Sequence, residues 1–330
     1  MILIISAEDD NHVLGVTRKL EAIGAEYLWF NPASFPAESE VLVTYSRFGL
    51  AHQLLRHQGR DVDLALVTAV WDRRPGLPTA AEKVKGEVQR KWISEEGGYC
   101  LAGVWENMDC LWVPGKRRDV IAGQNKVKLL TVAADLGFRI PRTLITNSPE
   151  GFLQFYSECG GRLVTKVLRD GLVYQDNETH MAYTHAVRRR DTANYRAVHY
   201  APLIIQEYVP KQLELRITVV GSSVFAAEIH SQASRCTQHD WRHYDNDRAT
   251  YAPHTLPAGI EMLCIRLVRT LHLSFGAIDM VLTPANEYVF LEINPTGQWS
   301  WIESLTGLPI STAIADLLVR GAVTTAEGKS

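Results

Sequence analysis

The sequence predicts an α+β protein with more than one lobe, and three observations support this fold class. The chain has 330 residues, which exceeds the size of an average single domain. Its N-terminal part alternates short apolar runs with a stretch of helical period, the pattern of a small α/β unit. From residue 202 onward, several strand-like runs follow one another with only short turns between them. The hydrophobic fraction of 46% and the charged fraction of 22% are those of a globular protein that can bury a core.

The first elements are predicted from the opening residues. The apolar run ILIIS at 2–6 is typical of a buried parallel strand, and the acidic residues after it supply N-caps for a helix over 12–24. Gly24 ends that helix, and further strands are predicted at 26–31 and 64–71. The first turn contains no G-x-G-x-x-G, so a dinucleotide site is not expected there.

The middle of the chain predicts a lobe boundary followed by a smaller folded part. Proline, glycine and polar residues mark its loops, and apolar periodicity marks its helix and strands. In order, we expect a loop leading into a helix at 72–87, the boundary at 112–126, a helix over 125–138 with Leu129, Leu130, Val132, Ala133 and Leu136 on one side, an extended segment at 140–147, a strand at 162–168 with Lys166 inside it, and a mobile, hairpin-containing region at 169–195.

The last part of the chain is rich in predicted strands. An amphipathic helix interrupts them, with apolar residues close to i, i+3/i+4 spacing. In order, we expect strands at 202–210, 213–221 and 224–231, the helix over 257–276 with Ile260, Leu263, Leu267 and Leu271 on one side, a strand pair at 277–283 and 287–295, and a closing helix over 300–321.

The composition also argues against several classes of protein. A net charge of −3 without a block of like charges gives no support for a nucleic-acid or membrane-surface partner. The start is too short for a signal peptide and no apolar run reaches the ~20 residues of a membrane span, so we expect a soluble, cytoplasmic protein. Five cysteines without a C-x-x-C favour reduced packing residues over a disulfide framework or a zinc site. His239 and His243 have no adjacent third metal ligand.

The predicted strand pair places two carboxylates opposite each other. If the turn is centred on Ala285 and Asn286, Asp279 faces Glu292, with Asn294 on the same side. Like charges directly opposite destabilise a sheet, so a cation between them is the expected explanation. Hard oxygen ligands from two strands suit Mg²⁺. The alternative is a solvated face with an accidental acid pair.

Each face of this strand pair has a predicted set of neighbours. The apolar face should carry Ile278, Met280, Leu282, Val289, Leu291 and Ile293. The acidic face should carry Ala277, Val281 and Phe290 beside the acids, which would form the floor of a pocket.

A magnesium site of this kind implies a phosphate ligand, but the usual phosphate loops are absent. The chain has neither G-x-x-x-x-G-K-[ST] nor the kinase motifs, so positive charge must come from single residues. Lys126 opens a predicted helix, and Lys166 lies in an apolar strand, where a buried ammonium is costly unless an anion meets it. Arg216 shares a strand face with Glu214, and an internal ion pair between these two is the alternative to a phosphate role.

Taken in order, these features resemble the ATP-grasp superfamily. They are a lysine at a helix start, a strand lysine forty residues later, QEYV, ELR, AIDMV and LEINP. The resemblance implies an N-terminal Rossmann-like (pre-ATP-grasp) domain that is followed along the chain by an ATP-grasp fold. We therefore expect domains at 1–118, 119–200 and 201–330. It also implies ATP and Mg²⁺ as cofactors. The residues expected to bind the nucleotide are Lys126, Lys166, Gln206, Glu207, Tyr208, Val209 and Glu214. Asp279, Glu292 and Asn294 are expected to bind the metal, and Arg216 and Lys166 to supply catalytic charge.

A narrower resemblance is to the microviridin-type ATP-grasp peptide maturases, or graspetide synthetases. It lies in VWDRRP, IPRTLITN, KQLELRITVVG, HSQAS, DWRHYD and EINPTGQWSWIE. The chain departs from the family at Asp72, where a Tyr is usual, and the loop after Lys166 is hard to align. The resemblance implies a ligase that activates Asp or Glu side chains of a ribosomal precursor peptide as acyl phosphates and joins them to Thr/Ser hydroxyls or Lys amines.

The same resemblance implies a peptide partner, with a leader and a core, and raises a homodimer as an expectation. Candidate substrate contacts are Arg235, Asp240, Arg242, Gln298 and Trp299. The region 170–195 is expected to act as part of a lid, the alternative being a surface hairpin.

Two other readings stay open at this point. The first is an ATP-grasp ligase of free amino acids or short peptides, of the glutathione-synthetase or glutamate-adding kind. The second is a catalytically silent module that binds a nucleotide or peptide.

Overall fold

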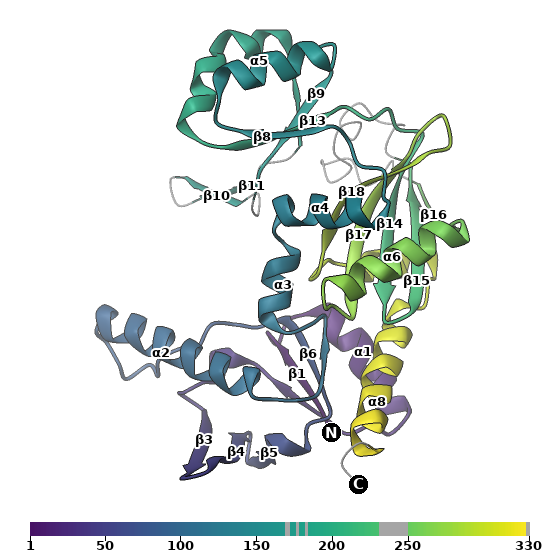
Figure 1. Ribbon diagram of the computed structural model, residues 1–330. Coiled ribbons are helices and arrows are strands. Elements are labelled where there is room, and N and C mark those ends of the chain that lie inside the picture. The colour runs from purple at the N-terminus through teal and green to yellow at the C-terminus, as the bar shows by residue number, and fades with distance from the viewer. Residues whose placement is uncertain (169–171, 176–177, 182–183, 231–249, 328–330) are drawn as a thin grey trace.

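The computed structural model describes residues 1–168, 172–175, 178–181, 184–230 and 250–327. It has an α+β architecture in which a parallel sheet at the base, a large antiparallel sheet and a small antiparallel sheet follow one another (Figure 1). The predicted fold class is confirmed. Both chain ends lie near each other at the base of the molecule (Figure 1).

The first lobe contains the predicted β-α-β unit. Its parallel sheet has the order β2-β1-β6-β7, where β1 is Ile2–Ser6, β2 Tyr27–Phe30, β6 Ala69–Arg74 and β7 Leu111–Val113. Helix α1 (Asn11–Ala22) begins where the Asp10 side chain accepts a hydrogen bond from the His12 N–H. An N-cap of this kind satisfies one of the free N–H groups at the start of a helix.

Two predictions in this lobe were wrong. The strand expected at 64–71 is displaced, since Leu64–Leu66 form a 3₁₀ turn capped by the Asp63 side chain and β6 runs from Ala69 to Arg74. The loop expected at 72–87 therefore starts as a strand. A three-stranded antiparallel sheet was not foreseen, with β3 at Ser39–Ser46, β4 at Gly49–His57 and β5 at Arg60–Asp63.

Helices cover both faces of the parallel sheet. Helix α2 (Glu87–Glu106) shares a core with one face, and α1 shares a core with the other. The C-terminal segment returns to this lobe as α7 (Ser300–Thr306) and α8 (Ile310–Glu327), and α8 packs on α1. One closing helix was predicted, but Gly307 takes a left-handed conformation (φ 72°) that ends α7.

The middle of the chain folds as a small lobe. Its sheet has the order β12-β9-β13-β8 and packs on α5 (Pro149–Glu158) and on a helical segment, η3 (Arg189–Tyr200). The strands are β8 Thr143–Thr146, β9 Leu163–Lys166, β12 His185–Val187 and β13 Leu203–Glu207, and the predicted hairpin is present as β10 Leu172–Gln175 and β11 Glu178–Met181. Helices α3 (Arg117–Gly123) and α4 (Lys126–Leu136) precede this lobe along the chain.

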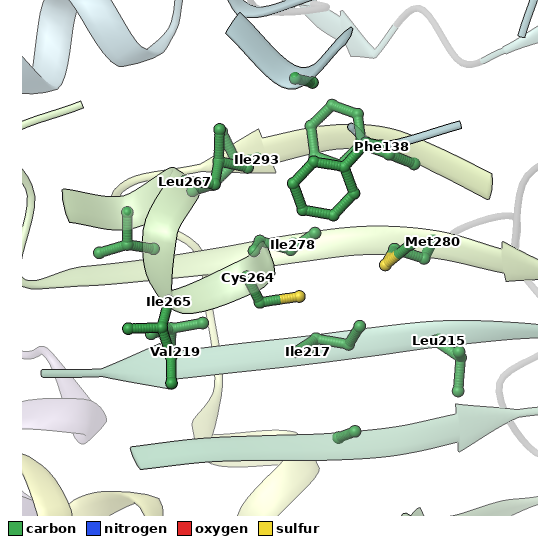
Figure 2. Packing of buried hydrophobic residues seen from close by; sticks show 14 of the residues in the cluster. Phe138, Leu215, Ile217, Val219, Cys264, Ile265, Leu267, Ile278, Met280 and Ile293 are labelled. Carbon is green, nitrogen blue, oxygen red and sulfur yellow. The ribbon is translucent and has the colours of Figure 1, made fainter. Parts of the chain in front are cut away.

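The large sheet has the order β16-β15-β14-β17-β18. Its strands are β14 Leu213–Val220, β15 Ser223–Ile229, β16 Tyr251–His254, β17 Phe275–Leu282 and β18 Tyr288–Asn294. Figure 2 shows apolar side chains from β14 and β17 packed under α6 (Ala258–Thr270) and against Phe138. The other face of the sheet carries Glu214, Asp279 and Glu292, with Val281 and Leu291 among them.

A β-bulge changes the predicted faces of β18. Asp279 pairs with Glu292 as expected, but Met280 pairs with Phe290, so Leu291 is the extra residue. An extra residue moves the following side chains to the opposite face of the sheet. Phe290 is therefore in the core, Leu291 is half-buried on the acidic side, and Val289 pairs with the cleft residue Val281, so the prediction for these three residues was wrong.

Candidate active site

A cleft lies between the small sheet and the polar face of the large sheet. The space between its lining side chains is about 600 Å³, part of which is open solvent. The predicted site residues that line it are Lys166, Gln206, Glu207, Tyr208, Val209, Glu214, Asp279 and Glu292. Lys126 lines a smaller hollow that shares Lys166 and Glu292 with the cleft.

The two carboxylates face each other on β17 and β18, and each has a cation from the protein. Asp279 Oδ1 lies 2.9 Å from Arg216 Nη1, and Glu292 Oε2 lies 3.6 Å from Lys126 Nζ. These contacts reduce the repulsion between the opposed acids. The predicted register of Asp279 and Glu292 is confirmed.

Arg216, on β14, lies beside Asp279 in the sheet. Its residue is 6% exposed, its Nη1 contacts both oxygens of Asp279, and its Nη2 donates to the carbonyl of Gln298 at 3.1 Å. Gly297 is needed at this point because a Cβ there would lie 2.8 Å from Arg216 Nη2 and 2.5 Å from the Cβ of Ala277. The loop after β18 therefore passes directly over the guanidinium group.

The two predicted lysines differ in their settings. Lys126, the first residue of α4, also donates to the carbonyl of Val167 at 2.8 Å, so it ties the start of α4 to the end of β9. Lys166 is the last residue of β9 and is half-buried, so its predicted place in the middle of an apolar strand was wrong. Its position at the strand end puts it on the cleft wall without burying it completely.

The predicted hinge segment connects β13 to the large sheet. Gln206 is 2% exposed and its Nε2 donates to Thr143 Oγ1 at 3.0 Å. The N–H groups of Glu207 and Tyr208 donate to the carbonyls of Arg142 and Arg162, each at 2.9 Å. These bonds hold the segment in place along the cleft. Burial, followed by the charge of Glu214, raises the pKa of the Tyr208 hydroxyl.

Lys211 is a cleft residue that sequence reasoning missed. Its Nζ lies 3.0 Å from Glu214 Oε1, and both side chains are nearly buried. The alternative pairing of Glu214 with Arg216 is thus replaced by two separate pairs, Lys211 with Glu214 and Arg216 with Asp279. The i, i+3 spacing of Lys and Glu in KQLE was the available signal.

The residues predicted to contact the substrate lie in different surroundings. Arg235, Asp240 and Arg242 lie outside the described residues. Gln298 is exposed at the edge of the site. Trp299 is 2% exposed and packs edge-on against the His12 ring, so the prediction that it contacts substrate was wrong.

The donor set fits a magnesium ion. Among the described residues, no three His, Cys, Asp or Glu side chains form a metal cluster. Two carboxylates with the amide oxygen of Asn294 would leave positions for water and phosphate oxygens, which Mg²⁺ prefers. The Asn294 Oδ1 already accepts hydrogen bonds from the N–H and Oγ1 of Thr296, at 3.0 and 3.2 Å, so its oxygen is oriented by the loop that follows it.

Asp72, on β6, is another titratable group with a shifted pKa. Burial raises the pKa of its carboxyl to about 6, although the charge of Arg117 opposes the shift. A perturbed pKa of this size is more frequent at functional sites than elsewhere, but structural networks produce it too.

This fold, with lysines, a hinge and an oxygen-rich strand pair around one cleft, defines an ATP-grasp ligase. Residues 1–118 match the model of the MvdD pre-ATP-grasp domain, and residues 123–318 match that of the RimK-like ATP-grasp domain. The chain therefore belongs to the RimK-like ATP-grasp family and carries an MvdD-type pre-ATP-grasp domain in front of it, which confirms the resemblance seen in the sequence. No match was found among curated proteins.

Several solved structures are similar over almost the whole chain. The macrocyclase MdnC from Microcystis aeruginosa MRC, bound with precursor peptide MdnA, is 32% identical, with 97% of this chain and 99% of that chain covered and a TM-score of 0.82. A RiPP-associated ATP-grasp ligase of Chryseobacterium gregarium, in complex with ADP and a leader and core peptide, is 30% identical, with 97% and 96% covered and a TM-score of 0.85. PsnB, complexed with minimal precursor, Mg and ADP, is 22% identical, with 97% of each chain covered and a TM-score of 0.76, and supports the fold alone.

Proposed function

We propose that this protein is an ATP-dependent peptide macrocyclase. In this proposal it activates Asp or Glu side chains of a ribosomal precursor peptide and joins them to Thr/Ser hydroxyls or Lys amines. The observation that carries the proposal is the likeness to MdnC and to the Chryseobacterium ligase, which extends through both the pre-ATP-grasp domain and the ATP-grasp domain. A likeness confined to the ATP-grasp domain would support an ATP-dependent ligase but would not indicate a peptide substrate.

The proposed chemistry proceeds in two steps. A carboxylate repels nucleophiles and has no good leaving group, so it does not condense with an alcohol or amine in water. Attack of the substrate carboxylate on the γ-phosphoryl group of ATP gives an acyl phosphate and ADP. The hydroxyl or amine of the same peptide then attacks the acyl carbon, loses its proton and displaces phosphate, which closes an ester or amide ring.

The cleft residues have distinct proposed roles. The hinge segment Gln206–Val209 would hold adenine, and Glu214, steadied by Lys211, would bind the ribose. Lys126, from α4, lies 3.6 Å from Glu292, and Lys166, from the small lobe, lines the same cleft; both would bind phosphate oxygens. Mg²⁺ bound by Asp279, Glu292 and Asn294 would neutralise charge on the transferring phosphoryl group.

Arg216 has a proposed role that depends on the nucleotide. Its Nη1 contacts Asp279, its partner on the neighbouring strand. We infer that the guanidinium adds fixed positive charge to the phosphoryl site, where one good electrostatic contact is typically worth about 3–4 kcal/mol.

A mass measurement tests this function. The protein would be incubated with ATP, Mg²⁺ and the precursor peptide encoded nearest its gene. We expect ADP and a product lighter by about 18 Da, one water, for each ring formed. A product that gains the mass of an amino acid would instead identify a ligase of free amino acids. No ADP with any candidate peptide would favour a silent binding module.

We also propose a cytoplasmic location and a peptide partner without nucleic acid. Among the described residues, no helix is long and apolar enough to cross a membrane. The net charge of −3 offers no field that would attract a nucleic-acid backbone.

A homodimer is the remaining part of the proposal, and helix α2 supports it. This helix extends away from the other elements (Figure 1). Its buried residues Gly97, Leu101 and Val104 lie on one side, and Val88, Trp92 and Tyr99 are 79%, 61% and 81% exposed on the other. Light scattering of the purified protein checks this proposal, and Trp92→Glu should shift a dimer towards monomer.

A further inference from the structure

The loop that follows the candidate metal ligands is held by residues of the first lobe. Arg73, on β6, donates from Nη1 to the carbonyl of Thr296 at 2.6 Å. His12, on α1, accepts at Nε2 from the N–H of Trp299 at 3.3 Å, and the same nitrogen lies 3.2 Å from Ser300 Oγ. More than 220 residues of chain separate each first-lobe partner from this loop.

Asp10 connects these two contacts. Its Oδ1 lies 2.9 Å from His12 Nδ1, and its Oδ2 lies 3.5 Å from Arg73 Nε. The carboxylate thus holds the imidazole with Nδ1 as the donor, which leaves Nε2 free to accept from the loop. We call Asp10, His12 and Arg73 the first-lobe anchor.

The first-lobe anchor is a costly arrangement for stability alone. Asp10, His12 and Arg73 are 7%, 7% and 5% exposed, and burying charged groups carries a desolvation penalty that apolar residues would avoid. Among the described residues, Nε and Nη2 of Arg73 have no hydrogen-bond partner. The Nη1 of Arg73 donates to the loop after the candidate metal ligands.

The same loop contacts the site from its other side. The Thr296 N–H and hydroxyl orient the Asn294 oxygen, and the Gln298 carbonyl accepts from Arg216. A shift of Thr296 or Gln298 would therefore turn the Asn294 amide or release one side of the Arg216 guanidinium. Gly297 leaves no space for the loop to settle closer to Arg216.

We propose that Asp10, His12 and Arg73 are positioning residues that set the loop after β18, and through it the Asn294 oxygen, for binding of the metal–nucleotide complex. The inference rests on the proposed magnesium site but not on the identity of the peptide. Residues that orient metal ligands typically change metal affinity by about 10–100-fold when they are replaced.

A binding experiment without peptide tests this role. Affinity for ATP would be measured by calorimetry as Mg²⁺ is titrated, for the wild type, Arg73→Met and Arg73→Lys. We expect Arg73→Met to raise the Mg²⁺ concentration that gives half-maximal tightening of ATP binding by about 10–100-fold. Affinity without Mg²⁺ should stay the same. Arg73→Lys, which keeps the charge and one donor for Thr296, should recover part of the effect.

Three further variants serve as control and substitutes in this test. Arg60→Met removes a first-lobe arginine whose ion pair with Glu26 is exposed, and it should leave the Mg²⁺ titration unchanged. If Arg73→Met does not fold, His12→Leu and His12→Gln take its place, because the glutamine oxygen still accepts from Trp299.

An unchanged Mg²⁺ requirement in a folded Arg73→Met or His12→Leu variant would overturn the inference. So would a wild type whose ATP affinity does not respond to Mg²⁺. A wild type that binds ATP with Mg²⁺ but closes no ring would contradict the proposed function only.

Discussion

Replacing Asp279 separates the structural and catalytic roles of the acid pair. The side chains of Asp279 and Arg216 are 14% and 7% exposed and lie 2.9 Å apart. Removing one partner of a buried ion pair leaves the other charge uncompensated, at a typical cost of about 3–5 kcal/mol. We therefore expect Asp279→Ala to lower the free energy of unfolding by about that amount. Asp279→Asn keeps an acceptor for Arg216 and should cost about 1–3 kcal/mol.

Glu292 provides the matched control. Its carboxylate lies 3.6 Å from Lys126, and the two side chains are 23% and 21% exposed, so water screens this pair more than the other. Glu292→Gln should cost about 1 kcal/mol or less. If both carboxylates bind magnesium, Glu292→Gln and Asp279→Asn should both abolish Mg²⁺-dependent ADP formation, although the change at Asp279 weakens the fold more.

The free energy of unfolding is measured by urea unfolding, followed by tryptophan fluorescence. ADP formation is measured at conditions below the unfolding transition. The double variant Asp279→Val with Arg216→Met should recover much of the lost stability, because it removes both buried charges together. Full activity in either single acid variant would refute the metal assignment. Equal destabilisation by Glu292→Gln and Asp279→Ala would refute the reasoning from burial.

Three further predictions concern residues around the site. Burial raises the pKa of the Asp72 carboxyl from its usual 3.8 to about 6, so its ionisation destabilises the fold increasingly as pH rises between these values. Asp72→Asn should thus stabilise the protein by about 3 kcal/mol at pH 8 and by about half of that at pH 5, as measured by urea midpoints. Burial would raise the pKa of Asp10, but hydrogen bonds from His12 and the charge of Arg73 lower it to about 2, so its stabilising effect is present above pH 3.8 and is lost as pH falls towards 2. Asp10→Asn should cost about 2 kcal/mol at pH 7, and the difference from the wild type should shrink in acid; a constant difference would contradict the depressed pKa. Gly297→Ala places a methyl group 2.5 Å from the Cβ of Ala277 and should cost about 1–3 kcal/mol in unfolding experiments and impair ADP formation, whereas Gly259→Ala, where the added methyl meets no atom within 4 Å, should leave ADP formation unchanged.

Local patterns predicted most of the elements and the central pair of acids. The short apolar run at 2–6 and the β-branched, alternating run at 213–221 form strands as predicted, and the turn between β17 and β18 places Asp279 opposite Glu292. The bulge at Leu291 was not predictable, since nothing in VFLEIN distinguishes a regular strand from one with an extra residue. The break in the C-terminal helix carried a visible signal in Gly307 and Pro309.

The sequence by itself determined the ligase class, because ordered short motifs record which residue types a nucleotide site needs. Only the tertiary structure decided which charges meet. Arg216 pairs with Asp279 instead of Glu214, and Arg73 and His12 reach a loop more than 220 residues away. Spacing along the chain governs neighbours within one helix or strand, whereas contacts between lobes depend on how β6, α1 and the loop after β18 pack together. That packing places the first lobe beside the candidate metal site.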